Sequence, residues 1–328
     1  MAGAFRWICL DDRQRRCEEM RARIDRGIQQ SVGVLLPPRT SWSMGVELAM
    51  KTVLVPVEAG EQLDSVFSGA LQLARRLECY VEGIPVGATF EGLVTYEGPI
   101  VAEALTRPED QPSADELGEL FSKFMQSNGV QQVSKPEPRL SFRWAGGDLA
   151  HENFIGNHSR LFDIAAVGRP RREGGSPSIT ITESVLFEGG RPVLVVPPGM
   201  NTSADFGKNI LIAWNCSTES ARAVSASIPL LKLAEKVLVL TVEGGTIPGP
   251  SGQQLCDSLA AHGVRADELT VARDPAGPGP AIIAEAEKMS ADLIVKGAYT
   301  NSRLRQMIFG GATRHLLHHA DLPVVMAN

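Results

Sequence analysis

Aromatic residues and long apolar runs are both scarce in this sequence. Aromatic side chains make up 5% of the 328 residues, which argues against a platform that stacks the bases of single-stranded nucleic acid. No apolar run approaches the ~20 residues of a membrane-spanning helix. The short apolar stretch at residues 5–10 is followed at once by Asp11 and Asp12, so it lacks the pattern of a signal peptide. We therefore expect neither a membrane nor a nucleic-acid partner.

Cysteine is also sparse, and positive charge is in deficit. The five cysteines contain no Cys-x2-Cys pair: Cys9, Cys17, Cys79, Cys216 and Cys256. This dispersed set fits a reducing cytoplasm better than a disulfide framework. The chain has 32 Lys and Arg against 38 Asp and Glu, for a net charge of −6, so no broad basic face is evident for nucleic acid. A content of 43% hydrophobic and 21% charged residues is typical of a globular chain, here long enough for about two domains.

Residues 1–49 differ in composition from the rest and are expected to form an N-terminal extension, disordered or partly helical. Residues 11–30 are highly charged, and Pro37 and Pro38 then interrupt regular structure. Translation from Met44 or Met50 is an alternative to a start at Met1. We assign no chemistry to this segment.

The first ordered part, residues 50–200, alternates between predicted strands and helices. Apolar and β-branched side chains fill residues 51–57, as in a buried parallel strand. A long insert is expected at residues 87–138. Its first part is irregular up to residue 112. A helix then starts with the capping-box pattern of Ser113 and Glu116. The other predicted strands are residues 80–86, 139–144, 162–168 and 191–196, and the other helices are residues 64–77 and 148–158.

The same pattern repeats in residues 207–328. KNILIA at residues 208–213 matches KTVLVP at residues 51–56, which indicates an internal repeat. The later strands are predicted at residues 236–242, 268–272, 291–296 and 322–326, and the helices at residues 217–234, 251–262, 280–289 and from 313 to 319. The greater length of the first unit is due mostly to its insert.

The alternation of strands and helices in each unit predicts an open, mostly parallel, five-stranded α/β sheet. This is the doubly wound, Rossmann-like kind. In such sheets ligands bind outside the carboxyl ends of the strands, where the strand order reverses. The loops after the first and fourth strands of the second unit flank this point, so Asn215 and residues 296–313 should face one crevice. The last strands, residues 192–196 and 323–326, should have exposed edges, and we expect the two units to pack there as a pseudo-dimer.

Residues 296–313, KGAYTNSRLRQMIFGGAT, form a glycine-containing loop between a buried strand and a helix start. Unpaired backbone N–H groups and the positive end of the helix dipole favour a phosphate at such a place. Glycines allow the backbone to approach a ligand closely, and arginines add positive charge. The residues concerned are Gly297, Gly310, Gly311, Arg303, Arg305 and Arg314. The alternative is that these glycines serve only as turn and cap residues.

The tandem units resemble the universal stress protein (UspA) family over residues 51–328. The resemblance is carried by IAWNCSTESARAV at residues 212–224 and by KGAYTNSRLRQMIFGGATRHLLHHADLPVVM at residues 296–326. Members that bind ATP carry Gly-x2-Gly-x9-Gly-[Ser/Thr] after strand four, and the matching positions here are Gly297, Thr300, Gly310 and Gly311. Thr300 and Gly311 depart from that motif, although Thr313 offers a hydroxyl two positions on. Asn215 replaces the family's aspartate and brings an amide without charge.

This resemblance implies that the second unit binds an adenine nucleotide, ATP or AMP, with Mg²⁺ accompanying ATP. The phosphates would lie on the backbone amides of residues 297–312 with help from Arg303 or Arg305, and Asn215 and Ser217 would contact the sugar or the base. The full predicted set is Asn215, Ser217, Val242, Lys296, Gly297, Thr300, Arg303, Arg305, Gly310, Gly311, Ala312 and Thr313.

With no general base or metal cluster evident, the sequence favours a cytoplasmic binding or signalling protein of the stress response over an efficient enzyme. Two alternatives are a stress-linked scaffold that binds no nucleotide and a slow ATPase. Association of two copies is left open.

Three further patterns carry weaker predictions. In the first unit, residues 168–177 hold Gly174 and Gly175 at the wrong spacing and Glu58 at the acidic position, so we expect a structural or degenerate site there. His315 and His319 are spaced to share a metal, but we favour surface or helix-capping roles. Cys216 is interpreted as a small buried thiol, and the sequence contains no Gly-x-Ser-x-Gly or Walker motif.

Overall fold

The structure is a computed structural model that describes residues 50–87, 112–171, 176–204, 206–298 and 311–328. The chain divides into a unit Met1–Glu47 and a compact unit Leu48–Asn328, and all described residues belong to the second. The predicted extension at residues 1–49 and most of the irregular insert lie outside the described residues. The proposed boundary between two domains near residue 200 stays a prediction.

The first half of the compact unit contains the predicted strands and helices and some short additions. Its strands are β1 (Thr52–Glu58), β2 (Tyr80–Val86), β3 (Gln131–Gln132), β4 (Ser141–Trp144), β5 (Ile164–Gly168) and β6 (Val193–Val196). Its helices are α2 (Leu63–Leu77), α3 (Ala114–Ser127), α4 (Glu152–Ser159), α5 (Ile179–Glu183) and the π-helical η2 (Ser184–Gly189). The predicted capping box is confirmed, since Ser113 Oγ accepts from Glu116 N at 3.2 Å and Glu116 Oε2 accepts from Ser113 N at 2.6 Å.

Two details of the first half differ from the sequence prediction. Helix α4 starts at Glu152 and not at residue 148, because Ala150 extends the sheet: its N–H donates to Pro85 O at 2.9 Å and its carbonyl accepts from Gly87 N at 3.0 Å. The sequence analysis also did not predict β3, α5 and η2, which are too short to show a clear periodic pattern.

The second half contains each predicted element with ends shifted by a few residues. Its strands are β7 (Asn209–Ala213), β8 (Lys236–Val242), β9 (Asp267–Val271), β10 (Leu293–Gly297) and β11 (Val324–Ala327). Its helices are α6 (Thr218–Leu231), α7 (Gly252–Ala261), α8 (Pro278–Lys288) and α10 (Ala312–His319).

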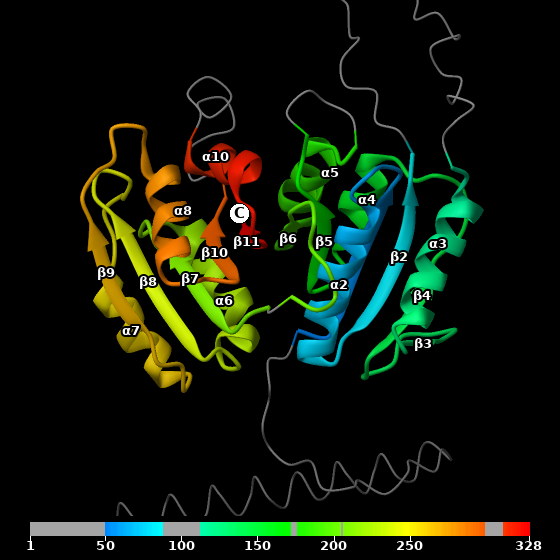
Figure 1. The fold of residues 1–328 in the computed structure, drawn as a ribbon, viewed down its shortest axis with the longest axis horizontal. Helices are drawn as coiled ribbons and strands as arrows, with labels where there is room; N and C mark the ends of the chain where they lie inside the picture. Colours follow the sequence, from blue (N-terminus) through cyan, green and yellow to red (C-terminus); the bar gives the residue numbers. More distant parts are fainter. Residues whose placement is uncertain (1–49, 88–111, 172–175, 205, 299–310) are drawn as a thin grey trace, which may run out of the picture. The chain divides into compact units, whose positions relative to one another are not determined.

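Within the described residues, eleven strands form one open sheet in the order β3-β4-β2-β1-β5-β6-β11-β10-β7-β8-β9 (Figure 1). Neighbouring strands are parallel except β6 and β11, which pair antiparallel with Val195 opposite Val324. The predicted pairing of the two last strands is therefore confirmed. In the second half the order reverses between β7 and β10, which are direct neighbours, as the alternation of strands and helices predicts.

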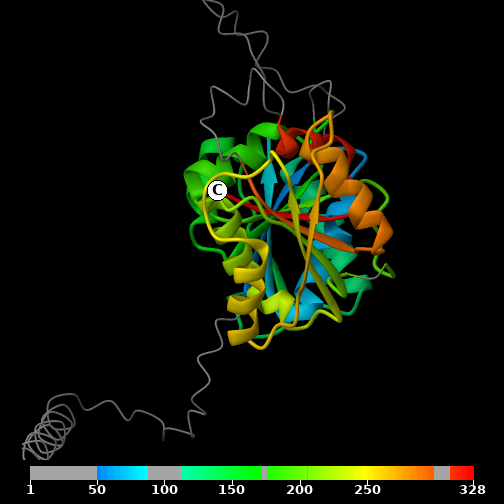
Figure 2. The same ribbon diagram turned by 90° about the vertical axis from the view of Figure 1, so that its left-hand side faces the viewer.

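Helices cover both faces of the sheet (Figure 2). Helices α2, α3, α6 and α7 pack in one apolar cluster, and α4, α5, α8 and α10 pack in the other. Strand side chains alternate between them: Val53 and Val55 lie in the first cluster and Leu54 in the second, because successive strand residues point to opposite faces. Across the described ranges, no helix has the length and apolar character needed to cross a membrane.

Candidate functional site

A small pocket of about 40 Å³ lies at the carboxyl ends of β7, β8 and β10, and we name it the inner pocket. Its wall consists of Ala213, Trp214, Asn215, Leu240, Val242, Gly245, Pro278, Ile282, Lys296 and Ala312. The location beside the β7–β10 reversal is where doubly wound sheets bind their ligands. Four of the predicted site residues therefore lie in one wall, namely Asn215, Val242, Lys296 and Ala312.

Lys296 places a buried amine in this wall. The residue is 8% exposed, and its Nζ donates to the carbonyl oxygen of Gly297 at 2.6 Å and to Thr313 Oγ1 at 2.8 Å. Burial lowers the pKa of Lys296 from 10.5 to about 8, because the charged form is poorly solvated there. Among the described residues no carboxylate forms an ion pair with this amine. Thr313 is the second residue of α10, so the amine faces the positive end of that helix dipole.

The turn after β7 brings Asn215 to the inner pocket and keeps Ser217 behind it. The Ser217 hydroxyl accepts from Ser220 N at 3.1 Å and caps α6, and the Ser217 N–H donates to Asn215 Oδ1 at 3.3 Å. Between them Cys216 has a φ of +67°, a left-handed conformation that is uncommon for residues other than glycine. Ser217 lies in the wall of neither pocket described here, so its clearest role is the helix cap.

Gly297 is required for packing. A Cβ atom at this position would lie 2.3 Å from the backbone nitrogen of Ser220, so only glycine lets the start of α6 approach the end of β10 so closely. This glycine lies outside the wall of the inner pocket. The sequence analysis connected Gly297 with phosphate, whereas the described contacts explain it by the meeting of a helix and a strand.

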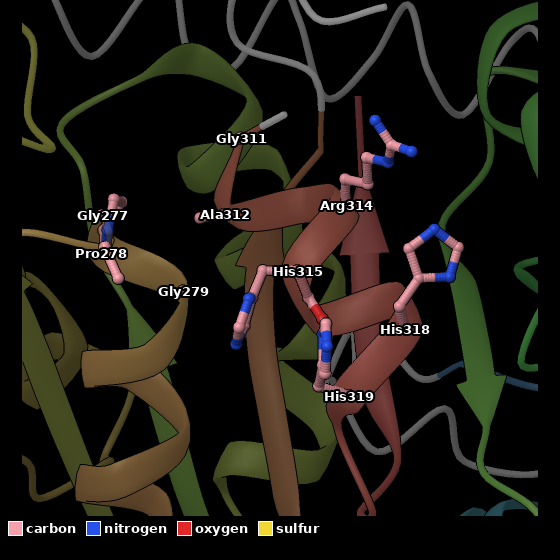
Figure 3. A pocket seen from close by; sticks show the side chains of 10 residues that line it. Gly277, Pro278, Gly279, Gly311, Ala312, Arg314, His315, His318 and His319 are labelled. Carbon is pink, nitrogen blue, oxygen red and sulfur yellow. The ribbon is translucent and has the colours of Figure 1, made fainter. Parts of the chain in front are cut away.

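A larger pocket of about 400 Å³ lies between the starts of α8 and α10 (Figure 3), and we name it the outer pocket. Its wall consists of Ala276, Gly277, Pro278, Gly279, Gly311, Ala312, Arg314, His315, His318 and His319. Pro278 and Ala312 belong to both pockets, so the two pockets adjoin. Within the described residues, no group of three or more His, Cys, Asp or Glu side chains is placed to hold a metal ion.

Several wall residues were not predicted from the sequence. Trp214 is fixed by a hydrogen bond from its Nε1 to the carbonyl oxygen of Pro250 at 2.8 Å, and Pro278 belongs to the first turn of α8. Their only sequence signal is their position after a strand or at a helix start. The remaining predicted residues, Thr300, Arg303, Arg305 and Gly310, lie outside the described residues.

The corresponding place in the first half is filled by the chain itself. A cavity of about 10 Å³ remains there, lined in part by Glu58, Gly168 and Pro177. A Cβ atom at Gly168 would lie 2.3 Å from Pro177 Cγ, so Pro177 packs directly on that glycine. Glu58 Oε1 accepts from Ser178 N at 3.0 Å at the start of α5. Burial raises the pKa of Glu58 from 4.5 to about 7, and the bond from Ser178 partly opposes this shift.

Comparison with known proteins agrees with this architecture. Residues 207–328 match the model of the Universal stress protein family, and no curated protein matches the chain. A universal stress protein from Archaeoglobus fulgidus DSM 4304 is similar with a TM-score of 0.59 and 15% sequence identity, over 85% of this chain and 97% of that one. A functionally unknown protein from Pseudomonas aeruginosa PAO1 has a TM-score of 0.46 and 14% identity, over 85% and 92%. Residues 207–328 therefore match the universal stress protein family, and the similar structure from Archaeoglobus fulgidus shows that the chain has a fold of the same kind.

Proposed function

We propose that the second half binds an adenine nucleotide, ATP or AMP, at the inner pocket, and that this protein serves the stress response by binding and not by efficient catalysis. The observation that carries the proposal is the buried amine of Lys296. Its pKa is lowered by burial, with no carboxylate among the described residues to balance it. A buried charge without an opposite charge nearby is costly, and a phosphate beside Nζ would provide that negative charge.

The location of Lys296 favours a phosphate over other anions. Its Nζ donates to Thr313 at the start of α10, and the N–H groups of a first helical turn point toward such a ligand. The helix dipole, the backbone N–H groups and the ammonium group of Lys296 would then all attract the same phosphate. An anion here would stabilise the protonated form of Lys296 and offset the burial that lowers its pKa.

The rest of the wall suits the remaining parts of a nucleotide. Leu240, Val242 and Ile282 supply apolar surface for a flat base, and the Asn215 amide is able to bond a sugar hydroxyl or a base edge. The inner pocket alone is small, but together with the adjoining outer pocket it falls in the range of about 300–1,000 Å³ typical of small-molecule sites. That the ligand is an adenine nucleotide rests on the family resemblance.

The described walls offer little for catalysis. No carboxylate lines either pocket in the part of the chain that the structure describes, so these walls supply neither a carboxylate base nor the oxygen ligands that Mg²⁺ prefers. A Mg²⁺ ion arriving with ATP would be held mainly by the phosphates and water. Binding without rapid turnover follows from this composition.

Isothermal titration of protein freed of nucleotide tests the proposal, with ATP and AMP as ligands. We expect micromolar binding to the wild type and a loss of at least about tenfold in Lys296→Met, the size of one charge-assisted contact. Lys288→Met is the matched control, because Lys288 lies exposed at the end of α8 and pairs with Glu285 at 2.5 Å. Absence of binding to either ligand in the wild type would reject the proposal and favour the scaffold function.

A further inference from the structure

The outer pocket is much larger than the single phosphate site at Lys296 requires. It has a volume of about 400 Å³ against about 40 Å³ for the inner pocket. The two share Pro278 and Ala312, so the outer pocket adjoins the inner pocket at the start of α10. The question is which chemical group its wall would recognise.

Among the described residues, the wall of the outer pocket contains one arginine, Arg314, and no acidic residue. Arg314 and the histidines of α10 belong to this wall, and Figure 3 shows His315 on the side toward α8 and Arg314 and His318 on the opposite side. The starts of α8 and α10 form its other sides, and neither helix has a side-chain cap at its N-terminal residue, Gly277 or Gly311. Pro278 and Pro280 have no backbone N–H, so the donors beside this space are the N–H of Gly279 and those of the first turn of α10. All of these groups favour an anion.

His315 and His319 are held in a defined arrangement on the side of α10 that faces α8 (Figure 3). Their rings stack with centroids 4.2 Å apart and planes at 19°. His319 Nδ1 donates to the carbonyl oxygen of His315 at 2.9 Å, since a carbonyl can only accept. His315 in turn packs against Gly279, where a Cβ atom would lie 2.6 Å from His315 Cβ. The pair is thus positioned before any ligand arrives.

The same helix joins this pair to the proposed phosphate site. Thr313, which receives the bond from Lys296 Nζ, lies two residues before His315 in α10. We propose that the outer pocket receives a second anionic group of the ligand, and that His315 and His319 thereby select nucleotides with two or more phosphates over nucleoside monophosphates. This inference rests on the proposed function, since Lys296 must hold the first phosphate.

Titration of ATP and AMP into the wild type and into the double variant His315→Gln/His319→Gln tests the inference. We expect the wild type to prefer ATP by about tenfold or more, and the double variant to lose most of that preference while its affinity for AMP stays within about twofold. Retained AMP binding shows that the variant is folded. The control is His262→Gln, at the exposed C-terminal end of α7, which should behave as wild type. His315→Gln/His319→Lys should recover part of the preference, because lysine supplies a positive charge at this place.

The possible outcomes separate this inference from the proposed function. Equal affinity of the wild type for ATP and AMP would overturn the inference and leave the nucleotide site standing. An equal loss of both ligands in the double variant would also overturn it, because the histidines would then only shape the crevice. If the wild type bound neither ligand, the proposed function itself would fail, and this inference with it.

Discussion

Replacing Lys296 by methionine should stabilise the protein when no ligand is present. The pKa of Lys296 falls from 10.5 to about 8, and at about 1.36 kcal/mol for each pKa unit this corresponds to roughly 3 kcal/mol of destabilisation when the amine is charged. Methionine is an unbranched apolar side chain that fills irregular space. It loses two hydrogen bonds, to Gly297 O and Thr313 Oγ1, each worth about 1 kcal/mol. The expected net gain at pH 7 is therefore about 1–2 kcal/mol in the free energy of unfolding.

The pH dependence of this gain has a definite sign. The folded state holds the Lys296 proton less tightly than the unfolded state, so wild-type stability should rise between about pH 8 and pH 10.5. Below pH 8 the penalty is fully present, and the advantage of the variant should be largest. At pH 10 the folded amine is neutral and most of the penalty is gone, so the loss of two hydrogen bonds should leave the variant no more stable than the wild type.

Urea unfolding of the full chain at pH 7 and pH 10, followed by circular dichroism, measures both effects. Lys288→Met, at an exposed position, should change little at either pH. ATP at one hundred times the wild-type Kd should remove most of the advantage of Lys296→Met, because it adds about 2.7 kcal/mol to the wild type and about 1.4 kcal/mol to a variant that binds tenfold more weakly. A Lys296→Met variant that is less stable than wild type at pH 7 without ligand, or whose advantage persists unchanged at pH 10, would refute the reasoning.

Four other substitutions follow from described contacts. Gly297→Ala should lower the free energy of unfolding by about 2–3 kcal/mol, because its Cβ would meet the Ser220 backbone. Gly311→Ala, with no described residue within 4 Å of a Cβ, should change it by less than about 0.5 kcal/mol, and equal effects in urea melts would contradict this. Glu58→Gln should stabilise the protein increasingly from pH 4.5 to above pH 7, where the buried carboxylate is charged; a pH-independent difference in melting temperature would argue otherwise. Ser217→Ala should cost about 1 kcal/mol through the lost cap of α6, with AMP affinity nearly unchanged by titration.

The sequence by itself determined most of the secondary structure and the position of the crevice. Apolar runs such as residues 80–86 and 236–242 predict buried strands, and the structure places β2 and β8 at the same bounds. Ser113 and Glu116 predict a capping box that forms. These patterns depend on neighbours three or four residues away, or on alternation along a strand, so they can be read without the fold. Alternation of strands with helices then predicts a doubly wound parallel sheet, and such a sheet has its crevice where the strand order reverses.

Tertiary structure alone decided what the crevice contains. Lys296 belongs to a predicted strand, and only the described packing shows that its amine is buried without a carboxylate beside it. Pro278 and Ala312 are distant in sequence, yet they form the common wall of two pockets. In the first half, Pro177 and Glu58 occupy the corresponding place. The burial of a side chain, its solvation and the room for a Cβ atom at a glycine depend on contacts between residues far apart in the chain. Local sequence patterns therefore cannot specify them.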